Sequence, residues 1–191
     1  MLRLPLLFCA LFLLPVACKP PAADDYVARV GIERREAPSE PIDSPNTEGA
    51  IWARSGGGSR IIYGKPGERP LMALACEMRD GAPVVAYTRF ARADAHAKAI
   101  LALIGNSHVA RLKIDAERSG EVWIWKGTVP AESPELEALT GPRQIEATVP
   151  GAGSVILNPS AEPGALIAQC RSLVGERAET SSEEEFPEAA E

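Results

Sequence analysis

The chain begins with a short apolar segment, and this segment constrains the fold because it determines the compartment in which the protein folds. One basic residue, Arg3, precedes an apolar run over 4–16, and the polar residues 19–21 follow. The run is about thirteen residues long, whereas a membrane-spanning helix needs roughly twenty. A basic start, a short apolar middle and a small residue before a polar break are typical of a removable export signal. We therefore expect residues 1–17 to be removed and the rest of the chain to fold in an oxidising compartment.

The residues at the end of this segment resemble the signal of bacterial lipoproteins. The matching residues are Leu14, Val16, Ala17 and Cys18. The resemblance implies that Cys18 is diacylated, becomes the first residue of the mature chain and anchors it to a membrane. Lys19 rather than aspartate follows the cysteine, which in this family favours the outer membrane. Ordinary signal cleavage near Ala17 or Cys18, giving a soluble periplasmic protein, is the alternative.

The cysteine count predicts one disulfide in the folded part of the chain. Of the four cysteines, one lies in the expected signal and Cys18 is the expected lipid site, which leaves Cys76 and Cys170. An even pair in an exported chain is typical of a disulfide. Both cysteines share a face with apolar residues, in the strand-like run 71–78 and the helical run 163–174. Two buried free thiols are the alternative interpretation.

Composition divides the mature chain into a tether, one domain and a tail. Residues 18–48 are rich in proline and acidic residues and poor in apolar ones, which favours a semi-extended tether over a packed structure. The tail 176–191 carries seven acidic residues and one basic residue, and we expect it to be disordered. Residues 49–175 between them are long enough for a single hydrophobic core.

The charge distribution bears on the kind of partner. The formal net charge is −6, yet residues 49–175 hold fourteen basic and twelve acidic residues. The negative charge therefore belongs to the flanking segments, and the expected domain is nearly neutral. Proteins that bind nucleic acid present a strongly basic face, so we predict that this protein has no nucleic-acid partner.

Local patterns in the expected domain predict mostly strands. The clearest is 108–116, where apolar and polar residues alternate over the whole run. Turn signals such as Asp80-Gly81 and Ser119-Gly120 separate neighbouring strands. The predicted strands cover 50–54, 60–63, 71–78, 83–90, 108–116, 121–126, 143–149 and 154–157.

Three segments are predicted to be helical. Asp94 is expected to cap a helix that extends to about Ile104. A short helix is predicted over 133–141, where a serine cap precedes a proline and an acidic first turn, and the last helix is predicted over 163–174. Strands and helices do not alternate regularly, which argues against a doubly wound parallel sheet. We predict an α+β fold: a mostly antiparallel sheet, curled into a partial barrel or sandwich, with two inserted helices and a C-terminal helix packed on it.

Motifs for catalysis and metal binding are weak. His96 and His108 are the two histidines of the chain, and neither has the spacing of a zinc site. The sequence over 151–154 lacks the last glycine of a nucleophile elbow, and the glycine-rich stretches do not form a phosphate-binding loop. We therefore predict no catalytic residues, no metal site and no cofactor.

Two short patterns are candidates for a binding surface. Trp123 and Trp125 are two residues apart in a predicted strand and therefore share one face. Burial in the core is one interpretation, and an exposed platform for a glycan or a protein is the other. Arg111 and Lys113 form a small basic stripe that suits an anionic polymer, with a solvated strand face as the alternative.

Together these patterns favour a lipid-anchored envelope protein that acts as a non-catalytic binding or structural module. Its lipid on Cys18 would hold it at a membrane facing the periplasm, and its partner would be an envelope protein or polymer. The size, anchor, β-rich core and single long-range disulfide also resemble, in general layout, the membrane-bound lysozyme-inhibitor lipoproteins. That resemblance implies a periplasmic enzyme inhibitor as the alternative function.

Overall fold

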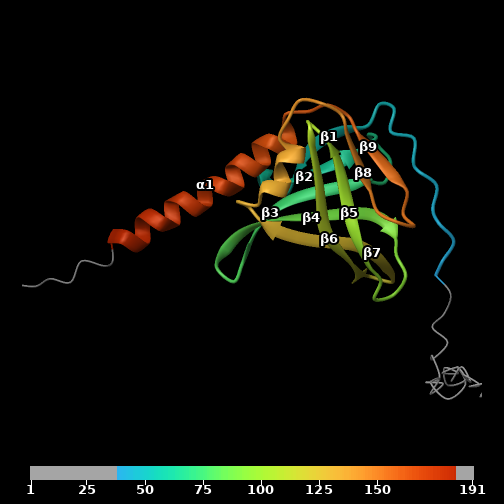
Figure 1. Ribbon diagram of the computed structural model, residues 1–191, viewed down its shortest axis with the longest axis horizontal. Coiled ribbons are helices and arrows are strands. Elements are labelled where there is room, and N and C mark those ends of the chain that lie inside the picture. The colour runs from blue at the N-terminus through green and yellow to red at the C-terminus, as the bar shows by residue number, and fades with distance from the viewer. Residues whose placement is uncertain (1–37, 184–191) are drawn as a thin grey trace, which may run out of the picture. The chain divides into compact units, whose positions relative to one another are not determined.

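Nine antiparallel strands form one sheet that curls into a nearly closed barrel (Figure 1). The computed structural model describes residues 38–183; the predicted signal 1–17, Cys18, the tether up to residue 37 and residues 184–191 lie outside the described residues. Along the sheet the strands follow the order β1-β2-β3-β4-β7-β6-β5-β8-β9. Their bounds are β1 Ile51–Ser55, β2 Arg60–Gly64, β3 Met72–Arg79, β4 Ala82–Arg92, β5 Lys98–Gly105, β6 His108–Ser119, β7 Val122–Pro130, β8 Ile145–Thr148 and β9 Ser154–Leu157.

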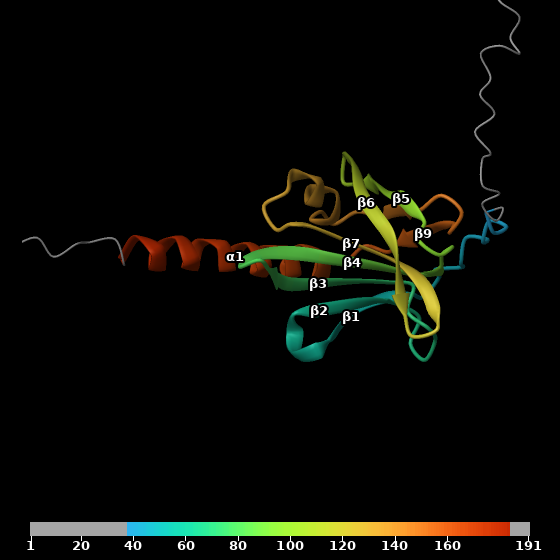
Figure 2. The same cartoon turned by 90° about the horizontal axis from the view of Figure 1, so that it is seen from below.

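Helical segments complete the described chain. A short 3-10 turn, η2 (Gly56–Gly58), joins β1 to β2, a second 3-10 helix, η3 (Pro134–Leu139), follows β7, and α1 (Glu162–Glu183) follows β9. Figure 2 shows the strands from a second direction, with α1 extending beyond one end of the barrel. The predicted α+β class, with a mostly antiparallel sheet curled into a partial barrel and a C-terminal helix packed on it, is confirmed.

Side chains alternate across the sheet, and one face of every strand turns into a common core. In β4, Val85 and Tyr87 are buried, and the buried residues of β6 include Ala110, Leu112 and Ile114. This period of two is the one expected for strands with one buried face. Burying a large aliphatic side chain contributes about 1.5–3 kcal/mol, so the shared core is the main source of stability for the barrel.

The helix predicted over residues 94–104 is wrong, because most of this segment is strand β5. Leu101 and Leu103 are fully buried, while Ile100 and Ile104 are exposed, which is the alternation of a strand. Asn106 and Ser107 then form a two-residue hairpin turn, with φ of 50° and 66°. Apolar residues at 100, 101 and 104 also fit a helical period, and a short apolar run satisfies both patterns. The pairing of β5 with β6 and β8 decides between them.

The short helix predicted over 133–141 is confirmed, as the 3-10 helix η3, with Leu136 and Leu139 buried. Asn106 holds the end of this helix in place. Its side-chain amide nitrogen donates to the carbonyl of Ala138 at 3.0 Å, and its amide oxygen accepts from the N–H of Arg143 at 2.8 Å. Gly141 is required here, because a Cβ atom at this position would lie 2.2 Å from the Asn106 amide oxygen.

Side chains close the seam between the two ends of the sheet, β1 and β9. The Tyr63 hydroxyl, from β2, donates to the carbonyl of Ile156 at 2.8 Å and accepts from the N–H of Asn158 at 3.0 Å. The Asn158 side-chain amide donates to the carbonyls of Thr47 and Ala50 at 3.0 and 2.9 Å. Tyr63 is fully buried, and this burial raises the pKa of its phenol. These bonds provide partners for backbone groups that no neighbouring strand can satisfy.

One end of the barrel is closed by α1 and the predicted disulfide. Leu166, Ile167 and Cys170 are fully buried under the barrel wall. Cys170 is bonded to Cys76 of β3, with a Cα–Cα distance of 5.5 Å, so the disulfide prediction is confirmed. Arg171 adds a hydrogen bond to the carbonyl of Ala131 at 2.9 Å.

The helix α1 extends further than the sequence predicts. We expected it to end near residue 174 and the acidic tail to begin at 176, yet the backbone is helical through Glu183. The tail prediction rested on charge. Glutamate, arginine and alanine, which are frequent over 176–183, are also good helix formers.

The other end of the barrel is crossed by residues 38–48, which we call the strap. Composition assigns these residues to the tether, yet the Ile42 N–H donates to the carbonyl of Gly151 at 2.9 Å. The Ser44 hydroxyl accepts from the N–H of Ser154, also at 2.9 Å. Most strap side chains are exposed, which agrees with the linker-like composition of this segment. Hydrogen bonds nevertheless fix the strap to the barrel.

The disulfide yields a first prediction. Cys76→Ser and Cys170→Ser should each lower the free energy of unfolding by about 3–5 kcal/mol, because either change frees a loop of about 94 residues in the unfolded chain. The double variant should lose no more than either single variant. Urea unfolding measures all three, and the wild type in reductant is the control. Additive losses would show that the two cysteines stabilise the barrel separately.

The seam yields a second prediction. Tyr63→Phe removes one hydroxyl and leaves the Ile156 carbonyl and the Asn158 N–H without their partner, which should destabilise the barrel by about 1–3 kcal/mol. Chemical unfolding with unchanged circular dichroism in the folded state is the measurement. A variant as stable as the wild type would mean that the seam is held by packing alone.

Candidate functional site

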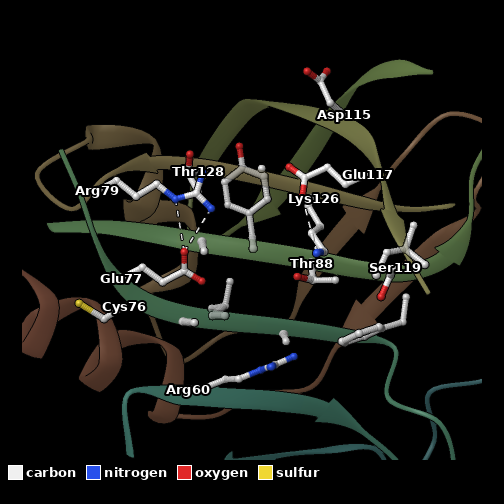
Figure 3. A pocket seen from close by; sticks show the side chains of 18 of the residues that line it. Arg60, Cys76, Glu77, Arg79, Thr88, Asp115, Glu117, Ser119, Lys126 and Thr128 are labelled. Atoms are coloured by element: carbon white, nitrogen blue, oxygen red, sulfur yellow. Dashed lines mark hydrogen bonds and ion pairs between the residues drawn. The ribbon is translucent and has the colours of Figure 1, made fainter. Parts of the chain in front are cut away.

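A groove of about 660 Å³ lies on the outer face of the sheet, over β2, β3, β4, β7 and β6 (Figure 3). Small side chains make its floor: Ala75 and Ala86 are cross-strand partners, and Ala86 is in turn opposite Thr128. In Figure 3, charged side chains stand on both sides of this floor. Because a strand exposes alternate residues, small residues on one face of three adjacent strands produce a hollow across the sheet.

The walls of the groove hold carboxylates that already have basic partners. Glu77 pairs with Arg79 at 3.2 Å, and Glu117 pairs with Lys126 at 3.6 Å. The third carboxylate, Asp115, pairs at 2.9 Å with a lysine of β5 that lies outside the groove. The side chains of all three pairs are 36–78% exposed, so each pair contributes less than about 1 kcal/mol to stability. They do, however, neutralise the acidic residues of the groove.

Two cations of the groove are left over. Arg60 and Lys113 form no ion pair with any residue of 38–173, the range over which side chains are described. Both are exposed. Arg111, two residues before Lys113 on the same face of β6, is likewise exposed and has no ionic partner in the described part of the chain. The residues that line the groove therefore carry one more positive than negative charge, and Thr88 and Thr128 lie among them.

Lys113 is positioned by the buried ring of Tyr87. The Tyr87 hydroxyl donates to the backbone carbonyl of Lys113 at 2.6 Å, and it does so where the pairing of β6 with β7 has ended. Gly127 makes this possible, because a Cβ atom there would lie 2.5 Å from the Tyr87 ring. Burial raises the pKa of the Tyr87 phenol to about 12, with a smaller contribution from the charge of Asp115.

The four residues predicted as a binding surface are separated by the fold. Arg111 and Lys113 lie on the outer face of β6, and Lys113 lines the groove. Trp125 is buried in the core, 6% exposed, so the exposed-platform interpretation does not describe it. Trp123 is half-buried against the core, and its ring lies 4.6 Å from that of His96, centroid to centroid. The tryptophans and the basic stripe therefore belong to opposite faces of the sheet.

Sequence analysis missed most of the groove. Arg60, Lys126 and Thr128 come from three strands, and only the register of the sheet places them together. The sequence contains one indication of the groove: small or polar residues occupy alternate positions, such as 86 and 88 in β4. This pattern indicates a face of the sheet that no other element covers.

Arg89 is a second feature that the sequence did not reveal, because it occupies a core position of β4. Its side chain is 3% exposed, and its guanidinium donates to the carbonyls of Leu71 and Ala152 at 3.1 and 3.0 Å. Burial lowers the pKa of Arg89 to about 10. A buried cation is ordinarily paired with an acid, and no carboxylate of residues 38–173 forms an ion pair with this one.

Asp94, which the sequence predicts as a helix cap, and His96 lie in the loop between β4 and β5. The Asp94 carboxylate accepts hydrogen bonds from the Ser39 hydroxyl and, at 3.0 Å, from the Ser39 N–H, and these bonds lower its pKa. Asp94 therefore fixes the strap and caps no helix. Within the described ranges, no three histidine, cysteine or acidic side chains are grouped as metal ligands would be.

Two further searches bear on the class of protein. Among residues 38–183, no helix combines the length and the apolar character needed to cross a membrane. Comparison with protein-family models, with curated proteins and with solved structures finds no match to this chain. The function proposed below therefore rests on the residues of this chain and on their arrangement.

The shifted pKa of Tyr87 yields a third prediction. The folded state holds the phenol proton more tightly than the unfolded state, whose tyrosine pKa is 10.0. The resulting stabilisation is complete below pH 10 and is lost as the pH rises towards 12. Tyr87→Phe should therefore decline less steeply than the wild type between pH 10 and 12 in urea unfolding. Parallel decline of the two proteins would contradict this assignment.

Proposed function

We propose that this chain is a lipid-anchored envelope protein whose barrel is a non-catalytic binding module for an anionic polymer of the cell envelope. The observation that carries the proposal is the outer groove, in which Arg60 and Lys113 have no ionic partner while every carboxylate has one. An anionic ligand gains charge-assisted hydrogen bonds from these two cations. The ligand does not first have to displace a carboxylate from either cation.

The shape of the groove supports a polymer as the ligand. It crosses five strands, and its two cations without an ionic partner come from different strands, Arg60 from β2 and Lys113 from β6. Exposed ionic contacts are individually weak, so useful affinity requires several contacts at once. A repeating anionic chain with hydroxyl groups supplies them, and it meets Thr88 and Thr128 between the cations.

The predicted anchor fits the position of the strap. The strap begins at residue 38, and about twenty residues separate it from the predicted lipid site at Cys18. A chain of this length spans at most about 70 Å when fully extended. In the proposed function this linker holds the barrel within reach of both a membrane and an envelope polymer.

Binding to isolated cell-wall sacculi tests the groove, and this is the fourth prediction. The double variant Arg60→Glu/Lys113→Glu should cosediment with sacculi at least tenfold more weakly than the wild type, and wild-type binding should fall as salt is added. The matched control is Arg69→Glu/Arg143→Glu, which makes the same change of charge at two exposed arginines outside the groove. Equal binding by both double variants, or no binding by the wild type, would refute the groove as the polymer site.

The mass of the intact protein extracted from membranes tests the anchor. We expect a chain that begins at acylated Cys18 and gains two protons on reduction, because the remaining cysteines of the chain are bonded to each other. An unmodified chain that begins near Lys19 would overturn the anchor. The sacculus experiment would then still decide whether a soluble form of the barrel binds the polymer.

A further inference from the structure

A second cavity, of about 630 Å³, opens at the end of the barrel that the strap crosses. It shares no lining residue with the outer groove. The strap forms one wall, and Ala93, Ala97 and Ala99, where β4 ends and β5 begins, form the other, with Trp125 of β7 between them. The lining is mostly apolar, and the volume is within the range of sites for small molecules, which are frequent in the mouths of β-barrels.

Trp125, one of the residues that line this cavity, holds an unsatisfied hydrogen-bond donor. The residue is 6% exposed, and its indole Nε1 is fully buried and has no hydrogen-bond partner. A buried indole N–H ordinarily finds a partner, and leaving a buried donor unpaired costs about 1–3 kcal/mol. An apolar aromatic ring without an N–H would fill the same space in the core. Packing therefore does not explain why this position holds an unpaired N–H donor.

Arg89 contributes a second unsatisfied donor beside the first. Arg89 and Trp125 are direct cross-strand partners in β4 and β7, and such partners have Cβ atoms roughly 5 Å apart on one face of the sheet. The Arg89 Nε is also buried without a partner. Trp125 lines the cavity, and Arg89 is its direct neighbour in the sheet but is not itself a lining residue. Arg89 carries a positive charge that no acid of residues 38–173 balances through an ion pair.

The charges at the rim do not explain this arrangement. Arg92 and Lys98 are basic, and Glu40 and Asp94 are acidic, so the entrance is balanced. Asp94 is engaged with the strap, and Lys98 pairs with Asp115 at 2.9 Å. Any preference of the cavity for one sign of charge therefore arises from Arg89, which is buried next to Trp125 behind the lining residues.

We propose that the mouth of the barrel is a binding site for a small amphipathic anion, a monocarboxylate with an apolar tail. Its carboxylate accepts from the Arg89 Nε and the Trp125 Nε1, and its tail lies against the alanines and the strap. This pairing satisfies both orphan donors and neutralises the buried cation. The site is independent of the polymer groove, because the two lie on opposite faces of the sheet.

Dodecanoate is the probe, added below its micelle concentration to the folded protein labelled with ¹⁵N. The chain has three tryptophans, so three indole N–H signals are expected, and Trp125→Phe identifies the one from Trp125. We expect saturable binding of one dodecanoate per chain, with a downfield shift of that indole signal as its N–H gains an acceptor. Dodecan-1-ol, which has the same tail without the charge, should bind at least tenfold more weakly.

Variants separate the site from a general affinity for fatty acid. Trp125→Phe keeps an aromatic ring in the core and removes only the N–H, and it should weaken dodecanoate binding five- to tenfold. Ala97→Phe should abolish binding by filling the cavity from its wall, while Arg89 and Trp125 stay in place. Trp123→Phe, which changes a tryptophan outside the cavity, is the matched control and should bind as the wild type does.

Several outcomes would overturn the proposal. The site is wrong if dodecanoate does not bind saturably, if dodecan-1-ol binds equally well, or if Trp125→Phe and Ala97→Phe bind like the wild type. In those cases the two donors are satisfied by ordered water, which is the usual alternative for buried polar groups in a roomy site. None of these outcomes changes the expected binding to sacculi, so the two proposals stand or fall separately.

Discussion

The hydrogen bonds at the seam are the constraint on which the rest of the structure depends. A sheet with two free edges exposes unpaired backbone groups and invites pairing with other chains. Here Tyr63 and Asn158 join the two ends of the sheet and also fix the segment that leads into β1. Closure gives the sheet an inside and an outside. Every site described above is a consequence of that distinction, since the groove occupies the outer face and the cavity occupies the inner one.

The sequence was sufficient for the strands and the disulfide, because those depend on short-range pattern and on cysteine count. Alternation over 108–116 predicted β6, and the turn at Asp80-Gly81 predicted the hairpin of β3 and β4. It was not sufficient for β5, whose apolar residues fit two periods until pairing with β6 and β8 chooses between them. Nor was it sufficient for the strap, which is held by hydrogen bonds to the barrel and not by apolar burial. Composition does not reveal hydrogen bonds of this kind.

The candidate sites were harder to predict than the fold, for a related reason. Lys113 was identified because basic residues alternate within one strand, whereas Arg60 and Lys126 join it only through the register of the sheet. Arg89 lies in a run that reads as an ordinary strand, and its burial is a property of the whole barrel. Trp125 was identified as notable for its type, but its place in the core beside Arg89 depends on a pairing that no local pattern encodes.

The disulfide and the seam together determine when the barrel can be completed. Cys76 forms its disulfide with Cys170, and Tyr63 forms its hydrogen bonds with residues 156–158. Residues early in the domain therefore complete their contacts only when the last residues of the domain are available. Folds dominated by such distant contacts assemble slowly. If the chain crosses a membrane from its N-terminus, β1 to β8 emerge before the strand and cysteine that complete them. Under the proposed export, the exposed β-edges must then be kept from other chains until α1 arrives, so the interval before the disulfide forms is the one in which aggregation competes with folding.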